Sequence, residues 1–267
     1  MEHISKYISP EIKLSSYHDK LFKSELVFDH HMLVWFISGE TKIIQAEATH
    51  FFKTGDIFFI PRNKPTTVIN YPTNGLPHQT VVMLLSNEIL KTFYSTYKPA
   101  VETVAVPGIK SYSNHPLLKS CLASLIPYFE VDGQLPENIA RLKISEALSI
   151  IRAIDPGIDG ILANFEHPHK VELVSFMEKH YPFNLPLEKF AYLTGRSLSS
   201  FKRDFHKAFN SSPQKWLTRK RLELAHYYLA ESRRKPVDVC FEAGFENLSH
   251  FSHAFKKHFG YPPTHLL

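Results

Sequence analysis

The sequence predicts an α+β fold, with a β-barrel and accompanying helices in residues 1–160 and an all-α domain in residues 168–267. The second domain is expected to hold two helix-turn-helix motifs joined by a long helix. Two observations predict this fold: short apolar runs separated by turn signals in residues 21–85, and a repeated segment near the C-terminus. A concentration of positive charge around that repeat bears on the partner of the second domain. A chain of 267 residues is long enough for two domains.

The first part of the chain is rich in β-branched and aromatic residues, which favour strands when turn residues separate them. We expect strands at residues 31–37, 41–44, 56–60, 67–69 and 80–85, with turns at 38–40, 53–56, 61–65 and 72–75. Short strands at this spacing are typical of a barrel or jelly roll.

Three helical patterns follow, over residues 87–97, 114–130 and 136–154. The second and third have apolar residues at helical spacing, such as Leu118, Leu122 and Leu125. Such a stripe is explained equally well by packing on the barrel and by a homodimer interface. Asp155-Pro156-Gly157 then breaks the helical pattern, and the segment 167–169 is expected to end the linker.

Residues 197–210 and 247–260 form a repeat, fifty positions apart. Each copy begins with a residue that commonly caps helices, Ser197 or Asn247. The apolar residues then fall at matching offsets, on one stripe of a helix: Leu198, Phe201, Phe205 and Phe209 against Leu248, Phe251, Phe255 and Phe259.

The other faces of both copies are polar and basic. The side chains there are Ser199, Ser200, Lys202, Arg203, His206 and Lys207 in the first copy and Ser249, His250, His253, Lys256 and Lys257 in the second. Asp204 is the single acidic residue in the two copies. A short helix with aromatic residues on one face and basic, hydrogen-bonding residues on the opposite face suits a groove of DNA.

A similar segment precedes each copy, at residues 186–195 and 236–244. Both begin with Pro, which is tolerated at the start of a helix, and end with Gly, which can adopt the left-handed conformation. Helix, tight turn and capped helix is the helix-turn-helix pattern, whose second helix enters the major groove. One match would be weak evidence, because antiparallel helix pairs are common, but two matches in phase indicate a paired DNA reader.

The segment between the copies has no Gly or Pro from Gln214 to Glu231 and predicts one long helix. A helix of about 20 residues spans about 30 Å, and successive major-groove faces lie about 34 Å apart. Such a connector could hold two recognition helices one DNA turn apart, although an ordinary core helix would show the same pattern.

Charge is distributed unevenly along the chain. Residues 168–267 contain 16 Lys and Arg against 9 Asp and Glu, a net +7, whereas residues 1–167 contain 15 against 17, a net −2. A basic domain of this kind is the electrostatic signature of a polyanionic partner.

Residues 168–267 resemble the DNA-binding domain of the AraC/XylS family of bacterial transcription regulators. The matching residues are Arg221-Leu222, Ala225, Gly244-Phe245, Ser249, Phe251, Phe255-Lys256-Lys257, Phe259-Gly260 and Pro263. Three residues depart from the family pattern: His253 stands where Arg is usual, Cys240 where a small residue is usual, and Asn210 where Gly is usual. None of the three breaks the motif.

The resemblance implies a sequence-specific regulator of transcription, an activator that binds double-stranded DNA and acts on RNA polymerase, with no cofactor. The sequence itself does not decide between activation and repression. The order of strand, Gly39, strand, Gly55-Asp56, strand and Pro61 is similar to the cupin-like barrel of many such regulators. In them this domain answers to a small-molecule effector or to a regulatory protein, and the sequence does not choose between the two. Arg62 and Lys64 could meet an anionic effector or could simply be solvated.

The DNA contacts can be assigned to individual positions. We expect Ser199, Ser200, Lys202 and Arg203 to face one half-site and His250 and His253 the other. Ser197, Asn247 and Ser249 are expected to contact phosphates at the helix N-termini, with His206, Lys207, Lys256 and Lys257 completing the basic faces.

A cupin-type metalloenzyme is the main alternative. Its metal needs His and Glu ligands that converge inside the barrel. Here His30 and His31 are adjacent and would point to opposite faces of a strand, Thr66-Thr67 stand where a later His is expected, and His78 is isolated. We therefore predict no metal and no catalysis, with these histidines at the barrel rim or surface.

The first twenty residues show no leader peptide, and no apolar run reaches the roughly 18 residues of a membrane span. The two cysteines, Cys121 and Cys240, are expected to be buried free thiols. These features predict a cytoplasmic protein that does not bind membranes.

Overall fold

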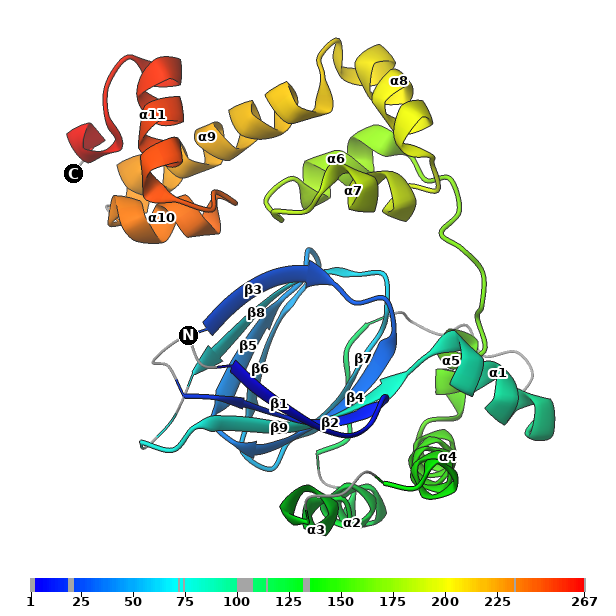
Figure 1. Cartoon of the computed structure of the whole chain (residues 1–267). Coiled ribbons are helices and arrows are strands. Elements are labelled where there is room, and N and C mark those ends of the chain that lie inside the picture. Colours follow the sequence, from blue (N-terminus) through cyan, green and yellow to red (C-terminus); the bar gives the residue numbers. More distant parts are fainter. Residues whose placement is uncertain are drawn as a thin grey trace. The chain divides into compact units, whose positions relative to one another are not determined.

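The computed structural model describes residues 3–18, 22–71, 73, 75–99, 108–113, 115–131, 135–232 and 234–266. The chain divides into two compact units, Met1–Glu166 and His167–Leu267 (Figure 1). Residues 72 and 74 of the turn expected at 72–75, and residue 114 of the helix expected at 114–130, lie outside the described residues.

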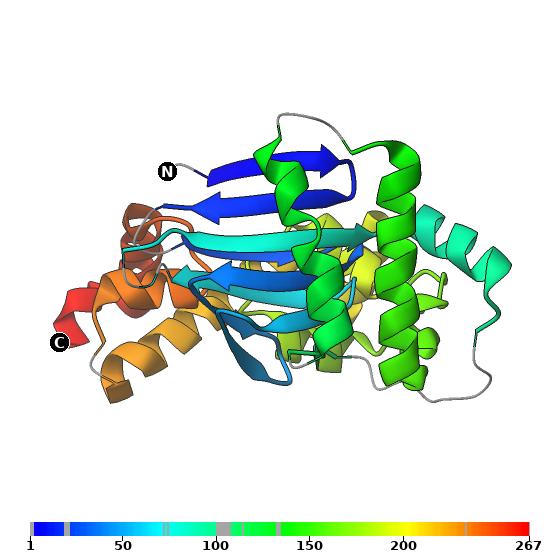
Figure 2. The same ribbon diagram turned by 90° about the horizontal axis from the view of Figure 1, so that it is seen from below.

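The strands of the first unit form two antiparallel sheets (Figures 1 and 2). One sheet has the order β1 (His3–Ser9), β2 (Ile12–Tyr17), β9 (His78–Leu85), β4 (His31–Ser38), β7 (Ile57–Ile60) and β10 (Lys110–Ser111). The other has the order β3 (Phe22–Val27), β8 (Pro65–Tyr71), β5 (Glu40–Ile44) and β6 (Thr49–Lys53).

The two sheets enclose one apolar interior. Val34 and Phe36 of β4 and Phe58 of β7 pack there with Ile43 of β5 and Phe52 of β6. The predicted α+β organisation is confirmed. Within the described strands, however, hydrogen bonds join the barrel wall into two open sheets and not into one closed cylinder.

Each of the five expected strands corresponds to a strand of the structure, namely β4, β5, β7, β8 and β9. The strands β1, β2, β3, β6 and β10 were not predicted. β1 and β2 are rich in Ser and Lys, and β10 has two residues, so none has a continuous apolar run. Pairing with a neighbouring strand, and not local composition, makes these segments extended.

The helices of the first unit are α1 (Asn87–Thr96), α2 (Pro116–Ala123), α3 (Ile126–Glu130), α4 (Glu137–Ile154), the 3-10 turn η1 (Pro156–Ile158) and α5 (Asp159–Leu162). Figure 2 shows α2, α3 and α4 lying across one face of the six-stranded sheet. Leu118, Leu122 and Leu148 share a core there with Leu33 and Phe59 of the strands. The predicted stripes are therefore used for packing on the sheet.

The single helix expected over 114–130 is wrong, because the structure has α2 and α3 with a break at Ser124-Leu125. Pro127 explains the break. It has no N–H to donate to the carbonyl of residue 123, and its ring clashes with that carbonyl in a continuous helix.

Three helices of the first unit meet at a buried ion pair. Arg152 of α4 donates from Nε to Asp159 Oδ1 at 2.6 Å and from Nη2 to Oδ2 at 2.8 Å. The hydroxyl of Tyr94 on α1 donates to the same Oδ1 at 2.6 Å. Since the Asp159 side chain is 2% exposed, this cluster fixes α1, α4 and α5 together in the interior.

The second unit is helical, with α6 (Leu173–His180), α7 (Leu187–Leu193), α8 (Leu198–Phe209), α9 (Pro213–Ser232), α10 (Pro236–Glu242), α11 (Leu248–Phe259) and the turn η2 (Pro263–Leu266). The N-terminal half of α9 packs on the first motif, where Trp216 lies 5.6 Å from Phe205 between ring centres. Its C-terminal half places Leu222 and Ala225 in the core of the second motif. No helix among the described residues is long and apolar enough to cross a membrane.

Candidate nucleic-acid interface

The first motif consists of α7, a tight turn at Gly195, and α8. The preceding segment from Val171, with α6 and the α6–α7 loop, is counted with this motif because α6 packs on α8. Gly195 has φ +65°, and a Cβ atom there would lie 2.5 Å from the backbone nitrogen of Lys170. Any larger residue would therefore collide with the chain that leads into this unit, besides adopting an unfavourable backbone conformation. The glycine expected from the sequence is thus required by both conformation and packing.

Arg196 follows this glycine and joins three parts of the motif. Its Nη1 donates to the carbonyl oxygens of Val171 at 3.0 Å and Thr194 at 2.7 Å, and its Nε donates to Asp204 on α8 at 3.2 Å. The Arg196 side chain is 8% exposed. The sequence reasoning missed this residue, whose only signal was a cation placed directly after the turn glycine.

Both recognition helices begin with the predicted caps. Ser197 Oγ accepts from the backbone N–H of Ser200 at 3.3 Å, and Asn247 Oδ1 accepts from that of His250 at 2.7 Å. These bonds satisfy one of the free N–H groups at each helix N-terminus. At the other ends, Asn210 and Gly260 adopt the left-handed conformation, with φ of 47° and 87°.

The two helices bury equivalent residues. Phe201 and Phe205 of α8 are fully buried, as are Phe251 and Phe255 of α11. The aromatic stripe therefore faces inward in both copies, and the polar face is left on the outside.

The candidate DNA-binding residues lie on that outer face. Ser200 is half-buried, and the remaining twelve are exposed: Ser197, Ser199, Lys202, Arg203, His206, Lys207, Asn247, Ser249, His250, His253, Lys256 and Lys257. The seven residues between Ser197 and Lys207, Ser200 included, lie on α8 and its cap. The six between Asn247 and Lys257 lie on α11 and its cap.

The two faces differ in one respect. On α8, Asp204 accepts from Arg196 and from the Arg203 guanidinium, whose Nε and Nη2 lie 3.4 Å from Asp204 Oδ1. Arg203 is 66% exposed, so this long contact leaves its guanidinium within reach of a ligand. α11 has no acidic residue, and its outer face combines two lysines with histidines.

Helix α9 separates the two recognition helices. It has 20 residues, which corresponds to about 30 Å, and Figure 1 shows α8 and α11 at its opposite ends. The distance between successive major-groove faces on one side of B-DNA is about 34 Å. The length of α9 therefore matches the separation that two such helices need.

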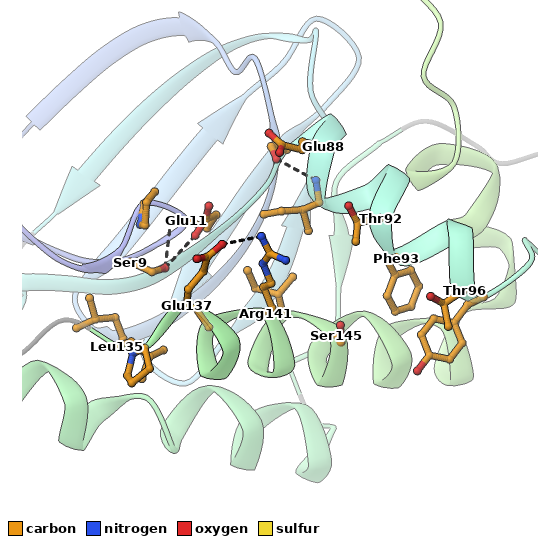
Figure 3. A pocket seen from close by; sticks show the side chains of 18 residues that line it. Ser9, Glu11, Glu88, Thr92, Phe93, Thr96, Leu135, Glu137, Arg141 and Ser145 are labelled. Carbon is orange, nitrogen blue, oxygen red and sulfur yellow. Dashed lines mark hydrogen bonds and ion pairs between the residues drawn. The ribbon is translucent and has the colours of Figure 1, made fainter.

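A groove in the first unit is a second candidate site (Figure 3). It has a volume of about 730 Å³ and lies between the β1–β2 turn, α1 and α4. Buried Ile8, Phe93 and Ile144 belong to its lining. Its polar residues include Glu11, Glu88 and the ion pair between Glu137 and Arg141, whose Oε1 and Nη2 are 2.6 Å apart.

Two histidines expected at the rim or surface are buried, so that expectation is wrong for His31 and His78, which are 3% and 2% exposed. His30 is exposed as expected. His31 Nδ1 accepts from the backbone N–H of Arg62 at 3.1 Å, and His78 Nε2 lies 2.7 Å from the Thr41 hydroxyl. Each is enclosed by segments distant in the chain, which local sequence could not reveal.

Burial disfavours the charged form of both imidazoles. It lowers the pKa of His31 to about 3, with the neighbouring Arg62 and His30 adding to the effect. Burial likewise lowers the pKa of His78 to about 4. Both side chains are therefore neutral at physiological pH. Among the described residues no three His, Cys, Asp or Glu side chains form a group that could hold a metal ion.

The two cysteines are buried, as predicted, and do not form a disulfide with each other. Burial raises the pKa of the Cys121 thiol to about 12, with Glu146 contributing. Since the thiolate is the reactive form of cysteine, this raised pKa keeps Cys121 protonated and disfavours its reaction at neutral pH.

Known protein families match the two units of the chain separately. Residues 190–267 match the family described as a helix-turn-helix domain, and residues 31–156 match the ExsA N-terminal regulatory domain. The chain is 28% identical to the HTH-type transcriptional regulator ExsA of Pseudomonas aeruginosa over 235 residues, covering 85% of this chain and 82% of that protein. The chain belongs to the AraC/XylS family of transcription regulators.

Other relatives are regulators as well. The virulence regulon transcriptional activator VirF of Yersinia enterocolitica is 26% identical over 235 residues, covering 85% of each protein. Among solved structures, the chain is similar to an apo ToxT variant from Vibrio cholerae, with a TM-score of 0.48, 11% identity and coverage of 97% of this chain and 98% of that one. With its helix-turn-helix domain and its similarity to ExsA and VirF, the protein is a DNA-binding regulator of transcription.

Proposed function

We propose that this AraC/XylS-family regulator binds a two-part operator with α8 in one major groove and α11 in the next. The observation that supports this most is the equivalence of the two helices. Both are capped by a polar side chain, both bury the same phenylalanine positions, and both expose a basic face. A 20-residue helix connects them, close in length to the groove spacing.

The individual roles follow from chemistry and position. Ser199, Ser200, Lys202 and Arg203 contact base edges of one half-site, and Arg203 selects guanine because its two parallel N–H groups fit O6 and N7. His250 and His253 contact the other half-site. Phosphates bind at the helix N-termini and along the basic faces, through Ser197, Asn247, Ser249, His206, Lys207, Lys256 and Lys257.

Footprinting of purified protein on the chromosomal region around its own gene tests this function. We expect two protected segments one helical turn apart on the same side of the duplex. Affinity should fall steeply with salt concentration, because bound phosphates release counterions. A single uniform affinity for all DNA fragments would contradict sequence-specific binding.

The regulatory effect is activation. Support comes from the relatives, since VirF and RhaS are both named as transcriptional activators. Acting as an activator, the bound protein would contact RNA polymerase. In a transcription reaction with purified RNA polymerase and the footprinted promoter, added protein should increase the transcript. A decrease would make the protein a repressor and leave the DNA-binding proposal intact.

The first unit receives the regulatory signal, and the groove between the β1–β2 turn, α1 and α4 is the effector site. Its volume of about 730 Å³ lies within the range of roughly 300–1,000 Å³ that is usual for small-ligand pockets. The apolar lining and the carboxylates Glu11 and Glu88 suit a small molecule with an apolar body and an amine, while Glu137 is paired with Arg141.

Hexylamine serves as a probe of the groove, with hexanoate as the charge-reversed control. We expect hexylamine to raise the unfolding temperature of the intact protein, because a ligand of the folded state stabilises it. Ser145→Trp, which fills the groove, should remove this shift. An equal shift with hexanoate, or an unchanged shift in Ser145→Trp, would leave regulation by a protein partner as the better explanation.

The outer sides of α2 and α4 support a homodimer. Leu117 and Leu142 are 62% and 64% exposed there, although both helices belong to a packed layer. Sedimentation at micromolar concentration should show a dimer that Leu142→Lys converts to a monomer. A monomeric wild-type protein at these concentrations would exclude this interface.

A further inference from the structure

One buried cation in the second unit has no role in the proposed DNA contacts. Arg221 lies in the middle of α9, and it is 8% exposed although it is charged. A buried charge is costly unless hydrogen bonds replace its hydration. The groups that accept hydrogen bonds from Arg221 therefore indicate which segments this buried charge holds together.

The guanidinium donates to the α6–α7 loop, which precedes the first helix-turn-helix, and to the turn of the second helix-turn-helix. In the α6–α7 loop, Nε donates to the Tyr181 carbonyl at 3.1 Å, Nη2 to the Phe183 carbonyl at 2.8 Å and Nη1 to Asn184 Oδ1 at 3.2 Å. In the second motif, Nη1 also donates to the carbonyl of Gly244 at 3.2 Å, in the turn between α10 and α11.

The two motifs also touch directly at this place. A Cβ atom on Gly244 would lie 2.7 Å from the carbonyl oxygen of Pro182 and 3.0 Å from Arg221 Nε, so only glycine fits there. Beside them, Asn184 Nδ2 donates to Glu246 Oε1 at 3.0 Å. Figure 1 shows this loop of the first motif opposite the turn of the second, alongside α9.

This contact restricts a tilt of the two motifs relative to α9, which α9 alone would permit. A helix fixes the distance between the motifs, but each motif could still tilt against it. Hydrogen bonds from one guanidinium to both motifs oppose such a tilt, because the planar fork holds its acceptors in fixed directions. A lysine has one ammonium group and cannot span the same set of acceptors.

We propose that Arg221, with Tyr181, Phe183, Asn184 and Gly244, is a positioning residue that sets the angle between α8 and α11 and so restricts the operator spacing that the protein accepts. This cluster is called the Arg221 clasp below. The inference rests on the proposed function, in which both helices bind DNA, and it adds that their relative orientation is built into the free protein. Arg221 itself does not contact DNA in this arrangement.

The test uses the full-length protein and operators in which one or two base pairs are added to or removed from the segment between the half-sites. Wild-type protein should bind the native spacing about tenfold more tightly than its neighbours, since a misplaced helix loses base contacts worth about 1–3 kcal/mol each. Arg221→Lys should bind all these spacings with affinities within about threefold of one another. Arg219→Lys, an exposed cation on the same helix, is the matched control and should keep the wild-type profile.

A second measurement separates positioning from folding. Binding to a DNA with only one half-site should be the same for Arg221→Lys and wild type, because each motif retains its own core. A merely structural role would weaken binding to one half-site and to the full operator alike. Should Arg221→Lys fail to fold, the double variant Asn184→Ala, Glu246→Ala removes an exposed part of the same contact and should broaden the spacing profile to a smaller extent.

The outcomes are distinct. A wild-type protein without any preferred spacing would overturn the paired-groove function itself. A sharp wild-type optimum that stays equally sharp in Arg221→Lys, with half-site binding intact, would overturn the clasp alone. The clasp is also overturned if Arg221→Lys does not fold and the double variant keeps the wild-type optimum.

Discussion

The two units of this protein place their polar and charged groups in opposite ways. The first unit buries them: Thr41, His78 and Asp159 are at most 3% exposed. The second unit buries aromatic residues and places the cations of α8 and α11 on the surface. Arg196 and Arg221 are buried exceptions, and Arg221 joins the two motifs of that unit.

This difference separates two kinds of electrostatic effect. In the first unit, the Arg152–Asp159 pair and the imidazoles of His31 and His78 are largely desolvated, so they influence the stability of the fold and its dependence on pH. In the second unit, the cations of α8 and α11 are solvated, so they influence the stability little and can bind phosphates. Changes in the first unit should therefore appear in unfolding experiments, and changes on the recognition helices in DNA binding.

The largest expected effect on binding follows from a change in the length of DNA between the half-sites. Inserting five base pairs between the half-sites rotates one of them by about half a turn, beyond the reach of the rigid α9. We expect affinity to fall about a thousandfold, to the non-specific level, as measured by fluorescence anisotropy. Retention of affinity within about tenfold would show that the two motifs move independently and would contradict the fixed geometry of the second unit.

Breaking the ion pair of the first unit should have the next largest effect. Asp159→Asn removes the partner of Arg152, which is left largely buried, and should lower the free energy of unfolding by about 3 kcal/mol. Urea denaturation measures this loss. Arg141→Gln is the matched control: it breaks the pair with Glu137, whose side chains are 69% and 80% exposed, and should cost less than about 1 kcal/mol. Equal losses would refute the contrast between buried and exposed charge.

The buried histidines predict a dependence on pH. Their pKa values in the folded state, about 3 for His31 and about 4 for His78, lie below the ordinary 6.5. The unfolded chain therefore binds more protons below pH 6.5, and stability is full above that value and declines as the pH falls toward 4. For His78 the loss amounts to about 3 kcal/mol, since each pKa unit corresponds to about 1.4 kcal/mol.

Thermal unfolding between pH 4 and 7 tests this dependence. His78→Gln should flatten the curve, because its amide can still bond Thr41 and does not titrate in this range. An identical slope in wild type and His78→Gln would show that this imidazole makes no contribution to the pH dependence.

The smallest expected effect distinguishes two exposed cations of α8. Arg203→Ala should relax the preference at one base position by about 1–3 kcal/mol, whereas Lys207→Ala should weaken binding to all sequences alike and reduce the salt slope by about 1. Binding to a randomised operator library measures both. An unchanged sequence profile in Arg203→Ala would make Arg203 a phosphate contact, and the guanine assignment would be withdrawn.

Local patterns were sufficient for the helical unit. The phenylalanines of α8 and α11, with their caps and the glycines before them, lie within a few helical turns of each other, and the structure keeps them all in the expected places. Less of the first unit could be predicted from local sequence patterns. β1 and β2 have no continuous apolar pattern, and their strand character comes from pairing with each other and with β9.

The candidate site divides in the same way. The exposed cations of the recognition helices follow from helical periodicity, because the residues opposite a buried stripe must face outward. Arg196 and the Arg221 clasp could not be found in this manner. Arg221 bonds the carbonyls of Phe183 and Gly244, which are separated from it by 38 and 23 positions, and no pattern links such distant backbone groups.

By itself, the sequence determined the duplicated motif, its basic outer faces, the length of the connecting helix and the family, because each depends on neighbours within a few helical turns. Only the tertiary structure decided the open pair of sheets, the burial of His31 and His78, the ion pair of Arg152 with Asp159, and the position of Arg221 between the motifs. The reason is that burial and long-range hydrogen bonds arise when separate segments exclude water together, and the environment of a side chain is set by all of them.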